Sequence, residues 1–330
     1  MTTQQMPARP KLQPPLAGPG RPKRRRTEEE TGRAIWEEEP SWFGRLSKPV
    51  VLGLVVLIVA FPLYVVVVTS LSSTEAVTRA GGLVVIPREL TVAAYVQLLS
   101  GGVVTRALLI STVITLVGTL FSLAITVLAA YGLSRPGSLF HRPLLFVVLL
   151  TFLFGPGIIP SYLLVNSLGM IDSYSSLILP TAVSAFNLIV MRSFFMGIPG
   201  ELIDSARIDG AGEFAVLTRI VMPLSRAVVA VVGLFYAVGY WNAFFNALLY
   251  INDNNKWPLQ MVLRTYIVQA SPLPTGAGGV SSASGLGLEA APSLAIKMAI
   301  VVIAIVPVLV IYPFIQKHFT KGVIIGAVKG

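Results

Sequence analysis

The sequence predicts an all-α integral membrane protein with six transmembrane helices. Of its 330 residues, 54% are hydrophobic and 12% are charged, and the mean hydropathy is +0.77. A soluble domain contains about 45–50% apolar and about 25% charged residues, and it uses the charged residues to cover its surface. From Val50 onward the chain has too few charges for such a surface. The lipid bilayer is therefore the expected solvent for most of the chain.

Six apolar runs are long enough to cross a bilayer. A hydrocarbon core about 30 Å thick requires roughly 20 apolar residues in a helix. The runs are 50–70, 107–131, 143–165, 177–195, 227–250 and 294–314. Several contain prolines, which are tolerated where neighbouring helices or water satisfy the freed carbonyl groups. We expect each run to form one transmembrane helix.

The first 45 residues differ from the rest of the chain. They contain a basic run at 21–26 and acidic triplets at 28–30 and 37–39, with too little apolar surface to offset the entropy of ordering. We expect residues 1–45 to form a disordered cytoplasmic tail and residues 46–330 to form one six-helix domain. With both termini in the cytoplasm, 19 of the 25 Lys and Arg residues lie inside, as the positive-inside rule requires.

One cytoplasmic connection, residues 198–223, has a distinctive pattern. Pro199 favours the start of a short helix, and an apolar stripe follows it. The stripe consists of Leu202, Ile203, Ala206 and Ile208. Gly210 permits a positive backbone φ and hence a sharp turn before a second helix over about residues 213–219. The pattern predicts a helix-turn-helix that projects into the cytoplasm.

This connection resembles the coupling loop of binding-protein-dependent ABC importer permeases. The family pattern is Glu-Ala-Ala, two further residues, Asp-Gly-Ala, a Phe and then a Leu-Pro. The corresponding residues are Asp204, Ser205, Ala206, Asp209, Gly210, Ala211, Phe214 and Pro223. Three positions depart from the pattern, namely Asp204, Ser205 and Met222, and each keeps the charge, the small size or the apolar character.

The resemblance extends over about residues 50–330. Similarity to carbohydrate importer permeases of the maltose-permease group continues outside the loop, and it is strongest for the branch assigned to complex oligosaccharides. The similar segments are 154–164, 166–170, 191–195, 241–242 and 316–330. The resemblance implies a type I ABC importer transmembrane fold in the bacterial plasma (inner) membrane. It also implies a second permease subunit in a heterodimer, two ATPase subunits and an extracytoplasmic binding protein that delivers the solute, an oligosaccharide.

The same resemblance gives the connection a mechanical role. In the family, this loop sits in a cleft on the ATPase and transmits ATPase closure to the membrane helices. Asp204 and Asp209 would cap helix ends or meet basic groups of the ATPase. Ala206, Ala211 and Phe214 would supply close packing. The spacing alone fits an ordinary polar connection equally well.

Four polar or aromatic residues in or beside the spans are candidates for the translocation path. They are Asn187, Trp241, Asn242 and Asn246. Sugars need hydrogen bonds and aromatic stacking, which such residues supply. The same groups also join helices by hydrogen bonds, with Trp241 in an interfacial belt, and the residue types leave both interpretations open. Likewise, Gly155 to Gly157 would form either a helix break facing the cargo or a packing kink.

The sequence contains no pattern typical of catalysis. A glycine-rich phosphate loop ending in Lys-Ser or Lys-Thr is missing, so we expect ATP and Mg²⁺ to bind a separate ATPase and no cofactor to bind this chain. His141 and His318 are too far apart for a metal site. The basic run at 21–26 is a topogenic signal or contacts anionic lipid, without the folded basic face that nucleic acid requires. The alternative function is an ion- or proton-coupled secondary transporter, which needs ionisable residues near the membrane midplane.

Overall fold

The computed structural model describes residues 42–100, 102–135, 137, 140–268 and 293–327. They are mainly helical, with an isolated antiparallel bridge between Ser72 and Leu90. The elements in chain order are α2 (Trp42–Ser70), α3 (Thr74–Arg79), α4 (Ala93–Ser100), α5 (Val103–Ser134), α6 (His141–Leu153), α7 (Ile158–Ser167), α8 (Ser175–Ile178), η1 (Leu179–Thr181), α9 (Ala185–Met196), α10 (Gly200–Ile208), α11 (Glu213–Val216), η2 (Leu217–Val221), α12 (Met222–Leu224), α13 (Arg226–Trp241), α14 (Phe244–Tyr250), η3 (Asn254–Lys256), α15 (Leu259–Val268) and α17 (Leu294–Ala327).

The chain divides into two compact units, Met1–Val59 and Ala60–Gly330. The described part of the first unit is the amino-terminal portion of α2, and all other described elements belong to the second unit. Residues 1–41 of the predicted tail lie outside the described residues. Helix α2 begins at Trp42, within the last residues of that predicted tail.

Three helices are each long and apolar enough to cross a membrane. They contain the segments Leu46–Ser70, Val103–Ser134 and Leu294–Ile311. Three bent helix pairs also qualify when each pair is taken as one span, which brings the number of described candidate spans to six. Helix α17 continues through Pro307 and Pro313, in agreement with the expected tolerance of proline in a bilayer.

The prediction of one unbroken helix is wrong for the run 143–165. Helices α6 and α7 cover this run, and they meet at an angle of 117°. The chain leaves the helix between them because Pro156 has no N–H to donate and Gly157 adopts a positive φ of 80°, a conformation that suits glycine. The glycine-proline segment is therefore a true helix break.

The runs 177–195 and 227–250 are interrupted as well. In the first, the helical segment Ser175–Thr181 is bent by 51° from α9. The Ser184 hydroxyl caps the start of α9 by accepting from the Asn187 N–H at 3.4 Å. In the second, α13 ends before Asn242, whose side-chain amide donates back to the Val238 carbonyl at 3.0 Å. Local side-chain bonds to the backbone therefore mark the start of α9 and the end of α13 inside the predicted runs.

Helix α5 is the centre of the second unit, where it packs against α13, α9, α15 and α4. Its buried face carries small residues, including Ser122, Thr126 and Ala130. A Cβ atom on Gly118 would lie 2.8 Å from the ring of Tyr240 on α13. Small side chains allow membrane helices to approach closely and to pack through van der Waals contacts, which explains the tight α5–α13 pair.

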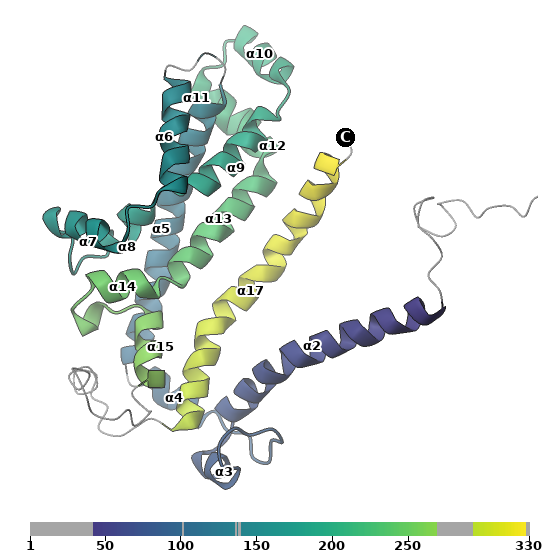
Figure 1. The fold of residues 1–330 in the computed structure, drawn as a ribbon, viewed down its shortest axis with the longest axis vertical. Coiled ribbons are helices and arrows are strands. Elements are labelled where there is room, and N and C mark those ends of the chain that lie inside the picture. Colours follow the sequence, from purple (N-terminus) through teal and green to yellow (C-terminus); the bar gives the residue numbers. More distant parts are fainter. Residues whose placement is uncertain (1–41, 101, 136, 138–139, 269–292, 328–330) are drawn as a thin grey trace, which may run out of the picture. The chain divides into compact units, whose positions relative to one another are not determined.

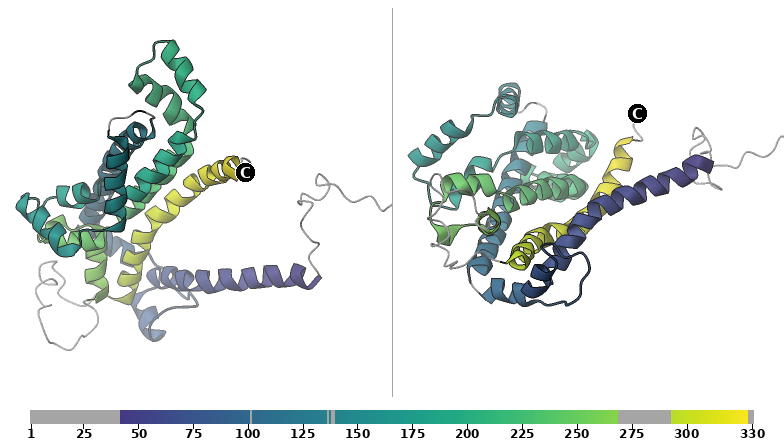
Figure 2. Two further views of the ribbon diagram at one scale, coloured as in Figure 1. Left: turned by 45° about the horizontal axis from the view of Figure 1, so that its top comes forward. Right: turned by 60° about the horizontal axis from the view of Figure 1, so that its bottom comes forward.

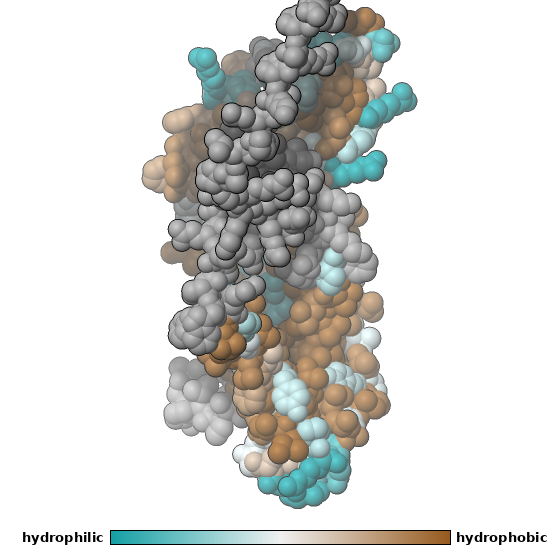
Figure 3. All heavy atoms as spheres, turned by 90° about the vertical axis from the view of Figure 1, so that its right-hand side faces the viewer, coloured by the Kyte–Doolittle hydropathy of each residue, from teal (hydrophilic) through white to brown (hydrophobic). Residues whose placement is uncertain are grey.

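Much of the outer surface is hydrophobic. Helix α6 buries none of its side chains, and Figure 3 shows hydrophobic side chains over much of one face where grey atoms do not hide it. Exposed apolar surface of this extent needs lipid or another protein as its neighbour. In contrast, α10 lies beyond the main helices at one end of the second unit (Figure 1).

Candidate functional site

The connection 198–223 forms the predicted helix-turn-helix. Helix α10 begins directly after Pro199, and the turn at Gly210 leads to a second helical segment that starts at Glu213. This segment is longer than predicted, because α11 continues through a π-helical turn, η2, into α12. Pro223 in α12 cannot donate to the carbonyl four residues earlier, and the wider π turn lies directly before it. The two helices project from the end of the second unit (Figure 2).

Gly210 closes α10 with two hydrogen bonds. Its φ is +83°, its N–H donates to the Arg207 carbonyl at 3.0 Å, and the N–H of Ala211 donates to the Ala206 carbonyl at 2.9 Å. This pair of bonds is the Schellman motif, which satisfies carbonyls that the helix end leaves free. No atom lies within 4 Å of a Cβ built at Gly210. Backbone conformation, rather than space, is therefore the reason for glycine here.

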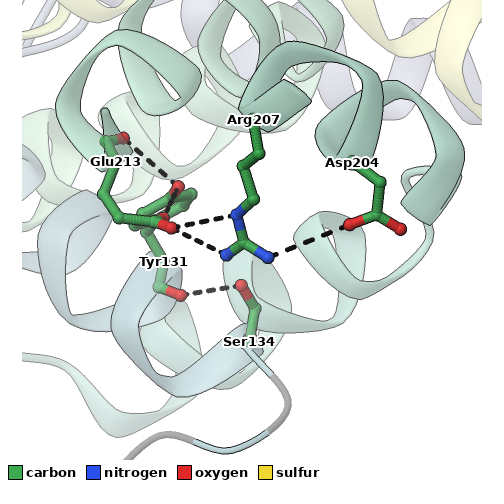
Figure 4. Close-up of polar contacts among 5 residues, drawn as sticks. All are labelled: Tyr131, Ser134, Asp204, Arg207 and Glu213. Carbon is green, nitrogen blue, oxygen red and sulfur yellow. Dashed lines mark hydrogen bonds and ion pairs between the residues drawn. The ribbon is translucent and has the colours of Figure 1, made fainter. Parts of the chain in front are cut away.

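A polar network ties the loop to α5. Glu213 accepts a hydrogen bond from the Tyr131 hydroxyl at 2.5 Å and forms an ion pair with Arg207, whose Nη2 lies 2.7 Å from Oε1. Figure 4 shows the Tyr131, Glu213 and Arg207 side chains pointing toward one another, with Asp204 on the far side of Arg207. Glu213 therefore connects α10, α11 and α5 at one point.

Sequence reasoning did not assign these three residues a role. The opposite charges of Arg207 and Glu213 on either side of the Gly210 turn are a local signal that could have indicated their pairing. Tyr131 lies 82 positions before Glu213, in an apolar run, so neither spacing nor composition could have indicated that contact. The structure thus adds an anchor on α5 to the predicted loop.

Neither predicted aspartate caps a helix through its side chain. Asp204 lies inside α10. Asp209 occupies the carboxyl cap of α10, where its backbone N–H donates to the Ser205 carbonyl at 3.1 Å. The N-terminal cap positions belong to Pro199 and Gly212, which form no side-chain cap. Aspartate caps free N–H groups, and a helix carboxyl end presents carbonyls instead. Asp204 is 3.9 Å from Arg207, but its side chain is 72% exposed, so this pair contributes little.

The predicted packing residues divide into two groups. Ala206 and Ala211 are half-buried against the core of this chain. Ile208 and Phe214 remain 86% and 72% exposed, at the tip of the loop. The Ser205 hydroxyl donates to the Glu201 carbonyl at 2.8 Å within α10. The loop therefore exposes an apolar tip, formed by Ile208 and Phe214, while its alanines pack inward.

A cavity of about 450 Å³ lies among η1, α9, α13 and α14. Three of the four predicted path residues line it, namely Asn187, Asn242 and Asn246. The fourth, Trp241, is 6% exposed and donates from Nε1 to the Ala304 carbonyl of α17 at 2.9 Å. Trp241 therefore joins two helices and takes no part in lining this cavity.

Aromatic side chains form most of the other cavity wall. They are Phe186, Phe235, Tyr236, Tyr240, Phe244 and Phe245. The Tyr236 hydroxyl pairs with the Thr126 hydroxyl of α5 at 2.7 Å and accepts from the Ser184 N–H at 3.0 Å. Tyr240 pairs in the same way with Ser122 at 2.7 Å. Both tyrosines therefore hold the cavity wall to α5.

A charged residue stands next to this wall. The guanidinium of Arg264 on α15 lies 5.0 Å from the ring centroid of Phe244, a distance that permits a cation–π interaction. The side chain is exposed. The cavity lining itself is uncharged among the residues that the structure describes, so Arg264 provides the positive charge at its edge.

Asp172 fastens together the connection between α7 and α8 and the connection between α14 and η3. Its Oδ1 accepts from the N–H groups of Asn252 at 2.6 Å and Asp253 at 2.8 Å, and its own N–H donates to the Tyr250 carbonyl at 2.8 Å. Lys256 donates to the Asp172 carbonyl at 2.8 Å. The φ of Asp172 is +58°, which aspartate tolerates better than most residues.

This clamp predicts a pH-dependent contribution to stability. The N–H of Asp253, followed by that of Asn252 and by the charge of Lys256, lowers the pKa of Asp172 from 3.8 despite opposing desolvation. A lowered folded pKa means that the stabilisation is complete above the unfolded pKa and is lost as the pH falls through the folded value. We expect Asp172→Asn to lower the thermal midpoint at pH 7, with a difference from wild type that disappears in strong acid.

Thermal unfolding of the purified protein from pH 7 down to about pH 2, below the lowered pKa of Asp172, measures this effect. Asparagine also tolerates positive φ, so the substitution isolates the charge. Asp204→Asn is the matched control, because that carboxylate is exposed and weakly paired. A constant difference between wild type and Asp172→Asn over the whole pH range contradicts the prediction.

The comparisons with known proteins agree with this architecture. No family model matches the chain. It is 44% identical over 274 residues to the polygalacturonan/rhamnogalacturonan transport system permease protein YtcP of Bacillus subtilis (strain 168), covering 83% of this chain and 94% of the relative. It is 45% identical over 258 residues to protein LplC of the same strain, covering 78% and 85%.

A solved structure supports the same assignment. It is a bacterial ABC transporter involved in the import of the acidic polysaccharide alginate, and it matches with a TM-score of 0.75 and 30% identity over 86% of this chain and 100% of the matched chain. These findings confirm the predicted all-α membrane fold and the predicted resemblance to carbohydrate permeases. The chain belongs to the family of multi-pass membrane permease subunits of sugar ABC importers.

Proposed function

We propose that this permease subunit imports an acidic oligosaccharide as half of a heterodimeric channel. Two separate ATPase subunits bind ATP and Mg²⁺, and an extracytoplasmic binding protein delivers the solute. The assembly lies in the bacterial plasma (inner) membrane, with the connection 198–223 and both termini in the cytoplasm. The observation that carries the proposal is the tie from this loop through Glu213 to Tyr131 of α5.

The contacts supply a mechanical route from the loop to the cavity. The exposed Ile208 and Phe214 suit an apolar cleft on the ATPase. Closure of the ATPase moves this tip, and the Arg207–Glu213–Tyr131 contacts pass the displacement to α5. Helix α5 packs against α9 and α13, whose side chains line the cavity. A rigid-body shift of α5 therefore changes the cavity wall.

The cavity has the chemistry of a sugar path. Asparagine side chains donate and accept hydrogen bonds, and the aromatic rings supply apolar surface for the faces of sugar rings. Arg264 beside Phe244 adds a guanidinium, which forms charge-assisted bonds with carboxylates. Proteins named for the transport of polygalacturonan/rhamnogalacturonan and alginate are similar over most of this chain, and they support an acidic sugar as the cargo.

Single cysteines test the loop assignment and the orientation together. The native sequence contains no cysteine, so an introduced thiol reacts without background. We expect Ile208→Cys to crosslink to an ATPase subunit and to resist a membrane-impermeant maleimide added to intact cells. Ile86→Cys, at a side chain of similar exposure, is the control that we expect to react from outside. Reaction of Ile208→Cys from outside would overturn the proposal.

Arg264→Gln is expected to weaken transport of an acidic sugar selectively. Losing one charge-assisted hydrogen bond corresponds to about a tenfold rise in KM. Uptake of an oligogalacturonide by the complete transporter in proteoliposomes measures this effect, with ATP inside and binding protein outside. Arg264→Lys should retain part of the affinity. Arg88→Gln, at an exposed position between α3 and α4, is the matched control. Equal KM values for wild type and Arg264→Gln contradict the proposed role.

The same proteoliposomes separate this function from ion-coupled transport. Uptake that requires ATP and survives an uncoupler supports an ABC importer. Uptake that continues without ATP and stops with an uncoupler supports the secondary-transporter alternative. The requirement for ATP is tested without any change to Arg264. The acidic-sugar assignment can therefore fail while the assignment as an ABC importer still holds, and the two failures give different results.

A further inference from the structure

A second cavity, of about 650 Å³, lies where the carboxyl end of α5 meets the start of α6 and the carboxyl half of α9. Its lining includes Arg135, His141, Arg142 and Arg192. Within the described parts of the chain, no acidic side chain contributes to this lining. We name these four residues the basic pocket. None of these four residues lines the cavity of about 450 Å³ described above, and none belongs to the loop of residues 198–223.

Several donors in the basic pocket lack acceptors. Arg192 donates from Nε to the Leu133 carbonyl at 2.9 Å and from Nη2 to His141 Nε2 at 3.2 Å. Because arginine only donates, His141 Nε2 accepts and the ring proton is on Nδ1. That Nδ1 atom is buried without a partner among the described residues, as are Nε and Nη2 of Arg135. Three buried donor nitrogens therefore lack an acceptor among the described residues.

Unsatisfied buried donors are costly, and those on a charged group are the most costly. One ligand with several anionic oxygens would satisfy the three donors and balance the charge of the arginines. A phosphate group has this chemistry. The start of α6 at His141 adds to the effect, because the 13-residue helix has no side-chain cap there and the N-terminus of a helix attracts anions.

The position of the pocket indicates the source of the phosphate. It lies at the end of α5, a helix of 32 residues that qualifies as a membrane span, so it is at the depth of lipid headgroups. Next to it, Leu144 and Phe146 on α6 are 50% and 59% exposed and offer apolar surface to an acyl chain. We propose that the basic pocket binds the phosphate of an anionic phospholipid in the leaflet on the side of the coupling loop.

The bound lipid would also influence the loop. The Arg135 guanidinium lies 4.3 Å from the ring centroid of Tyr131, and the Tyr131 hydroxyl binds Glu213. A phosphate that holds Arg135 thus fixes the ring that anchors the loop to α5. The lipid assignment depends on the contacts of the pocket and on its position at the end of a membrane span. Only the naming of the leaflet as cytoplasmic rests on the proposed function.

Native mass spectrometry of the purified transporter complex tests the proposal. The complex is exchanged into phosphatidylglycerol and phosphatidylcholine in equal amounts, and the retained lipids are counted. We expect retention of phosphatidylglycerol, reduced about tenfold in Arg135→Gln, in line with the loss of charge-assisted bonds. Arg142→Gln, at an exposed side chain, should also reduce it and provides a second variant that does not disturb the packing on Tyr131.

Arg219→Gln is the matched control. It removes the same charge from an exposed position in η2, outside the basic pocket, and should leave lipid retention at the wild-type level. A parallel arm adds inorganic phosphate to the complex in the same mixture of phosphatidylglycerol and phosphatidylcholine. Displacement of phosphatidylglycerol by millimolar phosphate, or equal retention by wild type and both pocket variants, overturns the assignment to a lipid.

Discussion

Gly210→Val should reduce uptake at least tenfold while the subunit still assembles in the membrane. Gly210 has a φ of +83°, a region that costs ordinary residues about 1–2 kcal/mol and β-branched residues more. Valine would move the residue out of this region. The two bonds that close α10, from Gly210 to Arg207 and from Ala211 to Ala206, would then break. The two helices of the loop would lose their fixed relation, and ATPase movement would no longer reach α5.

The control for this prediction lies two residues away. Gly212 has a φ of −70° and a ψ of 163°, which valine adopts readily, and no atom lies within 4 Å of a Cβ at either glycine. Both variants therefore add the same volume to open space, and only Gly210→Val strains the backbone. Gly210→Asn should retain intermediate uptake, because asparagine tolerates positive φ. Equal uptake by the two valine variants, measured with equal amounts of assembled transporter, contradicts the prediction.

The turn could be predicted from the sequence because its cause is local. Glycine after a short apolar helix and proline before it have backbone preferences that hold in any surroundings. The helix-turn-helix from Gly200 to Leu224 accordingly matches expectation. The apolar runs likewise predicted helices, since the bilayer sets their length and their hydrophobicity.

Interruptions within the runs were harder to predict. Run 143–165 is long enough and apolar enough to cross a bilayer. Length and mean hydropathy do not reveal a helix break inside the run. The sequence Gly155-Pro156-Gly157 was compatible with either a helix break or a kink. The angle of 117° between α6 and α7 depends on tertiary packing. The end of α13 before Asn242 has the same origin, because an asparagine either continues a helix or ends it.

Contacts between distant segments could not be predicted from spacing. Asp172 binds the N–H groups of Asn252 and Asp253, which lie 80 and 81 positions later, and a single aspartate in a short connection gives no sign of this. Trp241 had the residue type of a sugar-stacking side chain, yet helix rotation places its N–H against α17. The asparagines at 187, 242 and 246 do meet at one cavity, since the helix ends bring them together.

Glu213→Ala should uncouple ATP hydrolysis from transport. The substitution removes the acceptor of the Tyr131 hydroxyl at 2.5 Å and the partner of Arg207 at 2.7 Å, so the loop loses its side-chain tie to α5. The apolar tip of Ile208 and Phe214 remains, and the ATPase can still dock. We expect the complex to assemble and to hydrolyse ATP, while uptake per ATP falls about tenfold or more, as measured in proteoliposomes.

Tyr131→Phe provides the sharper comparison, because it deletes only the hydroxyl and keeps the ring against Arg135. We expect a smaller loss of uptake, and the double variant Tyr131→Phe with Glu213→Ala should be no worse than Glu213→Ala alone, since both changes break the same bond. Glu201→Ala, which removes an exposed carboxylate from α10, should transport normally. Additive losses in the double variant would mean that Tyr131 and Glu213 act separately. Movement of the loop would then have to reach the membrane helices through α12 and α13, which contact each other, and not through α5.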